Sequence, residues 1–194
     1  MTTEKVAERI VASRHVLAVG SMVLLVALAL FGQGDLPRAN TVVKPKALVS
    51  MQPAPRGSAV EVAVVAEILK GFHVNSNKPK EDYLIPTTLT PEVPAGLKVV
   101  ETTYPQGKTQ KFEFSETPLD VYDGTVIIRM KLQVAGDAPI GPLPLAMTLR
   151  YQACNDRACL PPVKLPVTAD LQIAEAGAKA VAQHPNVFPK TKTK

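Results

Sequence analysis

Two stretches of this 194-residue chain decide its fold: TVIIRMKLQV at residues 125–134 and PLPLAMTLRY at residues 142–151. In both, apolar and polar side chains alternate along the chain. A period of two places the apolar side chains on one face of a strand, which is typical of half-buried antiparallel strands. The predicted core faces consist of Ile128, Met130, Leu132 and Val134 in the first stretch, and of Leu143, Leu145, Met147 and Leu149 in the second.

Further strand candidates surround these two. AVEVAVVAEI at residues 59–68 is long and rich in valine, and shorter candidates lie at 84–89, 97–103 and 163–171. Turn signals rich in proline and glycine separate them, and no helical pattern competes. Six to eight short strands in the 116 residues from 58 to 173 predict an all-β fold, an immunoglobulin-like antiparallel β-sandwich. A small barrel is the alternative.

An unbroken apolar run, VLAVGSMVLLVALALF, occupies residues 16–31 and follows Lys5, Arg9 and Arg14. As an N-terminal helix it would span roughly 24 Å, slightly less than the hydrocarbon core of a bilayer. Residues 1–32 are therefore predicted to be a signal peptide or a membrane anchor, and either would export the domain that follows.

The segments on both sides of the predicted domain are basic. Residues 33–57 contain four prolines and are expected to form a Pro-rich basic linker, and residues 174–194 a flexible basic tail. The formal net charge is +5, yet residues 58–173 hold eleven basic and thirteen acidic side chains. Because the basic excess lies outside the predicted domain, no nucleic acid is expected as a partner.

The two cysteines of the chain lie close together in YQACNDRACLPP, residues 151–162. If residues 155–158 form a four-residue hairpin loop, Cys154 and Cys159 face each other across its base. Opposed Cα atoms are then about 4.5 Å apart, a separation that a disulfide tolerates. An exported chain would keep such a bond oxidised.

A disulfide across so small a loop contributes about 2 kcal/mol by chain entropy, against about 4.7 kcal/mol for a hundred-residue loop. Stability is therefore a weak reason for the bond, and a redox role and a structural role both remain open. Two thiolates without a nearby histidine supply half of a tetrahedral zinc set, so no metal is expected. A metal-handling chaperone is a weaker third possibility. Neither a phosphate loop nor a dinucleotide-binding motif occurs, and no cofactor is expected.

At these residues the chain resembles a known family. YQACNDRACLPP at 151–162 looks like the active-site segment of the N-terminal periplasmic domain of the thiol:disulfide interchange protein DsbD. GFHVNS at 71–76 and YPQG at 104–107 are similar to other parts of that domain. The resemblance covers about residues 58–171, and it implies an immunoglobulin-like fold. The spacing of the two cysteines is shorter than is usual in the family, which leaves the loop geometry and the redox potential open.

The resemblance implies a shuttle of reducing equivalents, an activity of the protein-disulfide reductase type. Cys159 would form the mixed disulfide with a partner, and Cys154 would resolve it. The implied partners are thioredoxin-like periplasmic proteins, including those of cytochrome c maturation, and a separate membrane electron carrier, since no multi-helix segment follows the domain. The implied location is the periplasm, with residues 16–31 tethering the domain to the inner membrane unless a signal peptide is cleaved. The alternative is a non-catalytic interaction module with a structural hairpin disulfide.

The family also shields its cysteines with an aromatic cap loop. KFEFS at residues 111–115 matches it best, and Phe114 is the cap candidate. An ordinary strand with Phe112 and Phe114 on one core face fits the same pattern at least as well. Tyr151 and Gln152 are candidates for lining a pocket beside Cys154. His73 is expected to be a turn or surface histidine, because no second ligand lies near it.

Overall fold

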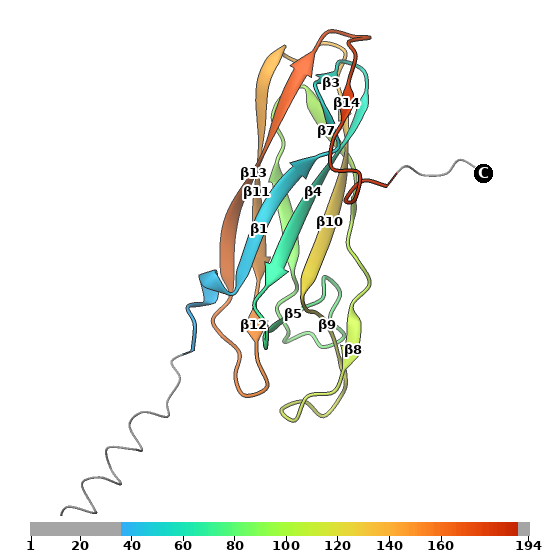
Figure 1. Ribbon diagram of the computed structural model, residues 1–194. Coiled ribbons are helices and arrows are strands. Elements are labelled where there is room, and N and C mark those ends of the chain that lie inside the picture. Colours follow the sequence, from blue (N-terminus) through green and yellow to red (C-terminus); the bar gives the residue numbers. More distant parts are fainter. Residues whose placement is uncertain (1–35, 190–194) are drawn as a thin grey trace, which may run out of the picture. The chain divides into compact units, whose positions relative to one another are not determined.

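Two four-stranded sheets face each other across a hydrophobic core in the computed structural model, which describes residues 36–189 (Figure 1). The first sheet has the order β1 (Val43–Val49), β4 (Ala59–Ile68), β10 (Thr125–Val134), β7 (Leu97–Thr103). The second has the order β3 (Ala54–Pro55), β13 (Val163–Ala174), β11 (Gly141–Tyr151), β6 (Thr88–Glu92). All pairings are antiparallel except β3 with β13. This arrangement confirms the predicted immunoglobulin-like β-sandwich.

The alternating stretches form the core as predicted. Every second residue of β10 from Val126 to Val134 is at most 4% exposed, and Leu145, Met147 and Leu149 of β11 are at most 2% exposed. Each such aliphatic side chain contributes about 1.5–3 kcal/mol when fully buried. β4 adds its valines between β1 and β10, and β13 closes the opposite sheet. Among the shorter candidates, 97–103 and 163–171 are strands, whereas the strand predicted at 84–89 begins only at Thr88.

A third, smaller sheet lies at one end of the sandwich, next to the ends of β11 and β4 (Figure 1). Its strands are short, and the sequence pattern predicts none of them. Its order is β12 (Ala153–Cys154), β5 (His73–Asn75), β9 (Leu119–Tyr122), β8 (Lys108–Gln110). β12 continues the direction of β11, so the chain passes from the core sheet directly into the sheet that carries the first cysteine.

The segment predicted to be a linker, residues 33–57, contributes strands instead. A short 3₁₀ turn (Ala39–Thr41) leads into β1, which pairs with β4 at seven positions, from Val43 opposite Ile68 to Val49 opposite Val62. The linker prediction was therefore wrong for this part of the chain. Its prolines are compatible with strands because β1 and β3 are edge strands. On the outer side of an edge strand the backbone N–H groups have no neighbouring strand to bond, so a missing N–H costs no hydrogen bond.

The segment predicted to be a flexible tail also contacts the domain up to residue 189. β14 (Val181–Ala182) pairs with β2 (Met51–Gln52), and the Gln183 N–H donates to the Ser50 carbonyl at 2.8 Å. The Arg129 guanidinium donates to the Val187 carbonyl at 2.9 and 3.2 Å. Backbone hydrogen bonding, which composition does not reveal, therefore holds most of this segment against the domain.

The predicted signal peptide or anchor, residues 1–32, lies outside the described residues, as do positions 190–194. Between residues 36 and 189, no helix has the length and apolar character needed to cross a membrane.

Candidate functional site

The two cysteines form a disulfide across a tight hairpin, as their spacing predicted. Cys154 and Cys159 are bridge partners in the backbone, and their Cα atoms are 4.0 Å apart. The Leu160 N–H donates to the Ala153 carbonyl at 2.8 Å, which continues the pairing one residue beyond the disulfide. The hairpin extends from the core strand β11 through β12, so a rigid element positions both sulfur atoms.

The loop between the cysteines is held by its own side chain. The Asn155 Oδ1 accepts hydrogen bonds from the backbone N–H groups of Arg157 and Ala158, each at 2.9 Å. The Asn155 N–H donates in turn to the Ala158 carbonyl at 3.0 Å. Asparagine favours such turns because its short side chain mimics a backbone carbonyl. The loop therefore has a fixed shape that does not depend on the disulfide alone.

The two sulfur-bearing residues differ sharply in exposure. Cys154 is 2% exposed, whereas Cys159 is exposed, together with Asp156, Arg157 and the following Pro161. A disulfide exchanges when a thiolate reaches one of its sulfur atoms, so access selects which sulfur reacts first. An approaching protein can reach Cys159 directly but not Cys154.

Gln152, a candidate for lining a pocket beside Cys154, contacts the hairpin that carries the disulfide. Its Nε2 donates to the Leu160 carbonyl at 3.2 Å, so the side chain crosses from the strand before Cys154 to the strand after Cys159. This contact braces the base of the hairpin.

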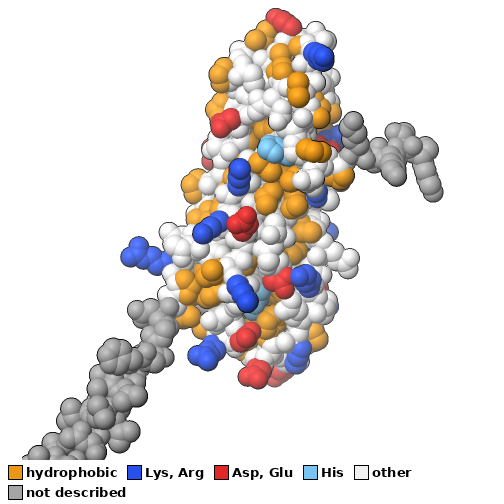
Figure 2. Space-filling model, in the orientation of Figure 1, with side chains coloured by type: hydrophobic (Ala, Val, Ile, Leu, Met, Phe, Trp, Pro, Cys, Tyr) orange, Lys and Arg blue, Asp and Glu red, His pale blue; other side chains and the backbone are white. Residues whose placement is uncertain are grey.

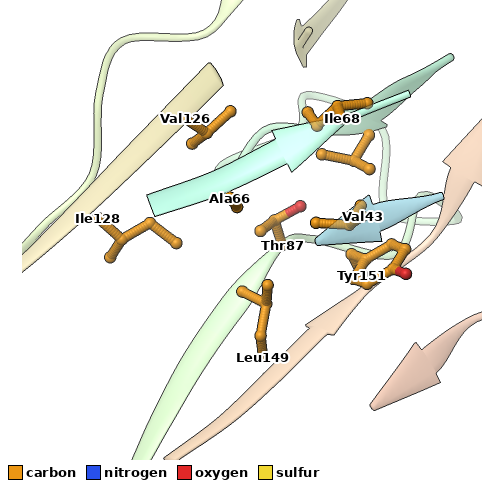
Figure 3. A pocket seen from close by; sticks show the side chains of 9 residues that line it. Val43, Ala66, Ile68, Thr87, Val126, Ile128, Leu149 and Tyr151 are labelled. Atoms are coloured by element: carbon orange, nitrogen blue, oxygen red, sulfur yellow. The ribbon is translucent and has the colours of Figure 1, made fainter. Parts of the chain in front are cut away.

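Tyr151 lies elsewhere. It is 1% exposed, and its hydroxyl donates to the Ala39 carbonyl at 2.8 Å. Its ring lines a small apolar space of about 10 Å³ between the sheets, with Val43, Ile128 and Leu149 around it (Figure 3). A space of this size can hold at most one water molecule. The alternation of β11 continues through Tyr151, so its side chain belongs to the core and not to a pocket at the disulfide.

An aromatic stack flanks the disulfide on the side of Cys154. The rings of His73 and Phe112 have centroids 4.2 Å apart, and Phe114 stacks on Phe112 at 5.3 Å. Phe112 is 8% exposed and packs with Leu119 and Val121, whereas Phe114 is 46% exposed. Phe114 is thus the solvent-facing member of the stack.

The segment that carries these phenylalanines is a loop between β8 and β9, and the alternative of an ordinary core strand was wrong. The Lys111 ammonium donates to the Ser115 carbonyl at 2.6 Å and also to the Glu116 carbonyl, which folds the segment back on itself. One phenylalanine can therefore be buried while the next remains half-exposed.

His73 was expected at a turn or on the surface, yet it is 5% exposed and lies in β5. Burial lowers the pKa of its imidazole, while the carboxylates of Asp156 and Asp123 act in the opposite direction. Asp123 itself has a lowered pKa, chiefly because the Lys108 ammonium donates a hydrogen bond to it. The net effect of these surroundings is to disfavour the protonated imidazole.

The described residues contain no group of three side chains able to ligate a metal. On the face of the domain in Figure 2, acidic and basic side chains are interspersed. That face carries no single-sign field of the kind that attracts nucleic acid. The chemistry that the described part of the chain offers lies in the cysteine pair and its surroundings.

A protein-family model described as "Thiol:disulfide interchange protein DsbD, N-terminal" matches residues 39–170. The chain belongs to this family. The match begins at residue 39, so the family domain includes the β1 segment that composition alone assigned to a linker. A comparison with curated proteins finds no match.

Two solved structures are similar to this chain. The N-terminal periplasmic domain of ScsB from Proteus mirabilis is 14% identical with a TM-score of 0.45, and the match covers 74% of this chain and 51% of that one. The chain thus spans about half the length of that structure. A complex between the DsbD N-terminal and PilB N-terminal domains from Neisseria meningitidis gives 18% identity and a TM-score of 0.40, with 70% and 88% covered.

Sequence reasoning missed the role of His73 and Phe112 in building the site. The missing information was the register of the third sheet, in which Cys154 lies opposite His73. A faint signal was present, since GFHVNS at residues 71–76 is part of the family resemblance. The short strand β5 gave no periodicity from which its partner could be predicted.

Proposed function

We propose that this chain is an exported thiol-disulfide exchange domain that passes reducing equivalents between periplasmic thiol-disulfide proteins through Cys154 and Cys159. The observation that carries the proposal is the unequal exposure of the two residues at the tip of a rigid hairpin. A purely structural disulfide needs no accessible sulfur, whereas an exchange reaction needs one accessible and one protected.

The geometry supports distinct roles for the two thiols. In the reduced domain, the Cys159 thiolate attacks a disulfide of a partner and forms a mixed disulfide, while the partner's second sulfur leaves as a thiolate. Cys154 then loses its proton and attacks the Cys159 sulfur. The Cys154–Cys159 bond forms, the mixed disulfide breaks, and the partner departs with both electrons as a dithiol. The hairpin keeps the two sulfurs close enough for ring closure, since the Cα separation is 4.0 Å.

Membership of the DsbD N-terminal family supports the partners that the sequence resemblance implies for this chain. Thioredoxin-like periplasmic proteins, including those of cytochrome c maturation, would accept or supply electrons. A separate membrane electron carrier would keep the pair reduced, and residues 16–31 would tether the domain to the inner membrane or be cleaved as a signal. The activity is of the protein-disulfide reductase type.

The deciding experiment is the redox potential of the pair in the full chain, measured by equilibration with glutathione followed by thiol alkylation. A potential between about −180 and −270 mV is expected, as in proteins that exchange disulfides. A bond that stays oxidised below about −300 mV and opens only on unfolding would contradict the proposal. The chain would then be a non-catalytic interaction module with a structural hairpin disulfide.

A pair of matched variants tests the assigned roles. Cys154→Ala retains the exposed thiol and should accumulate a stable mixed disulfide with oxidised glutathione, because nothing resolves it. Cys159→Ala retains the buried thiol and should react far more slowly under the same conditions. Equal rates for the two variants would contradict the assignment of Cys159 as the sulfur that meets partners.

A further inference from the structure

Three side chains form a row on one face of the small sheet. Cys159 lies opposite Cys154, and Cys154 lies opposite His73 in the pairing of β12 with β5. Residues directly opposite each other in antiparallel strands point to the same face, with Cβ atoms about 4.5–5.5 Å apart. The imidazole therefore neighbours Cys154 on the side away from Cys159.

The position of His73 leaves one polar atom without a partner. Its Nε2 is buried and makes no hydrogen bond, while Phe112 covers the face of the ring at 4.2 Å. A buried polar atom without a partner costs about 1–3 kcal/mol, so such an atom beside a reactive group calls for an explanation. In the oxidised domain the neighbouring sulfur carries no proton to share. After reduction, the Cys154 thiol becomes a donor at the strand position directly opposite this ring.

The charges around the ring partly oppose the effect of its burial on the protonated imidazole. Burial lowers its pKa, and the two carboxylates that act on it are Asp156, in the loop after β12, and Asp123, after β9. The Lys108 ammonium pairs with Asp123 and offsets part of that charge. A neutral imidazole has a free lone pair, and carboxylates on two sides stabilise the imidazolium that forms when it takes a proton.

We propose that His73 accepts the proton of the Cys154 thiol when Cys154 closes the disulfide. The inference rests on the exchange function proposed above and assigns a further group to that reaction. The Cys154 S–H proton moves to the imidazole, and the resulting thiolate attacks the Cys159 sulfur. The bond between Cys159 and the partner breaks, and its electron pair leaves with the partner's thiolate. The imidazolium then returns its proton to that thiolate or to water.

The size of the effect follows from the ionisation of a thiol. A free thiol with a pKa near 8.5 is roughly 3% thiolate at pH 7, so a base that assists its ionisation can accelerate its attack by up to about thirty-fold. Above the pH at which the Cys154 thiol ionises by itself, the attack needs no base. The benefit of a neighbouring base must therefore disappear there, which a merely structural contribution of His73 would not do.

The test uses the reduced full chain and the small aromatic disulfide DTNB. Cys159 releases one thionitrobenzoate as it forms the mixed disulfide, and ring closure by Cys154 releases the second at a rate independent of reagent concentration. This closing rate is measured from pH 6 to 10 in the wild type and in His73→Gln. His184→Gln is the matched control, because His184 is exposed and follows β14, remote from the disulfide hairpin (Figure 1).

His73→Gln should slow ring closure at pH 7 by several-fold to about thirty-fold, and its profile should meet that of the wild type once the Cys154 thiol ionises by itself. His184→Gln should match the wild type throughout. An unchanged rate at pH 7, or a slowing that persists after the rate of His73→Gln has levelled off with rising pH, would overturn the inference.

If His73→Gln does not fold, a measurement on the wild-type chain still tests the role of His73. Imidazole ¹⁵N NMR of the reduced chain should then show His73 changing protonation together with the Cys154 thiol, and Cys154→Ser should remove that coupled step. A ring whose titration ignores Cys154 would overturn the inference. The redox equilibration described under the proposed function tests the exchange function separately, because ring closure with DTNB needs no physiological partner.

Discussion

Phe112 and Phe114 are two residues apart, and the structure gives them different roles. We expect Phe112→Ala to destabilise the domain far more than Phe114→Ala does. The exposed fractions are 8% and 46%. With about 200 Å² for a phenylalanine side chain, truncation removes roughly 180 and 110 Å² of buried surface. At about 25 cal/mol per Å² the upper limits are roughly 4.6 and 2.7 kcal/mol.

The measured difference should be wider than these limits suggest. Phe112 contacts both His73 and Phe114 and also packs on Leu119 and Val121, so its removal leaves a cavity. The space vacated by Phe114 opens to water and costs no cavity term. We therefore expect a loss of roughly 3–4 kcal/mol for Phe112→Ala and roughly 1 kcal/mol for Phe114→Ala.

The assay is equilibrium unfolding in urea of the oxidised full chain, followed by circular dichroism, with the denaturant slope compared among the three proteins. Equal losses near 3 kcal/mol would show that both rings lie in the core, as in the strand that the sequence also allowed. A negligible loss for Phe112→Ala would show that the cluster beneath the stack contributes nothing. Either result would refute the reasoning that Phe112 is a buried packing residue and Phe114 an exposed one.

Three further predictions follow from individual contacts. Tyr151→Phe should lower the free energy of unfolding by about 1 kcal/mol in thermal denaturation, because the Ala39 carbonyl loses its donor; an unchanged value would mean that water replaces it. Gly96→Ala should destabilise by more than about 2 kcal/mol, since the residue has φ +90° and a Cβ there would lie 2.8 Å from the Ala138 Cβ. Gly136→Ala, where nothing lies within 4 Å, is its control. Because burial lowers the His73 pKa, protons bind the unfolded chain more readily, and stability should fall as the pH drops below about 6.5. Urea titrations at pH 7.5 and 5.5 should show a smaller loss of unfolding free energy in His73→Gln than in the wild type. An equal loss in both proteins would contradict the lowered pKa of His73.

The accuracy of the sequence prediction varied with the kind of signal. Period-two alternation located β10 and β11 to within a residue, because a strand that buries one face must repeat its apolar side chains at every second position. The proline content of residues 43–55 predicted a linker where the structure has strands. Proline is compatible with an edge strand, so composition alone cannot distinguish an edge strand from a linker.

For the site, the sequence by itself determined the hairpin, the pairing of its two cysteines and the family. The hairpin and its cysteine pair depend on residues within a dozen positions of one another, so local turn chemistry fixes them, whereas the family match extends over residues 39–170. Only the tertiary structure decided that Cys154 is buried while Cys159 is exposed, that Tyr151 faces the core, and that His73 lies beside the disulfide. Cys154 and His73 are 81 positions apart in the chain (154 minus 73), and they meet through the register of two short strands that carry no pattern of their own. Such a register is set by the packing of the whole sandwich, which no local stretch of sequence encodes.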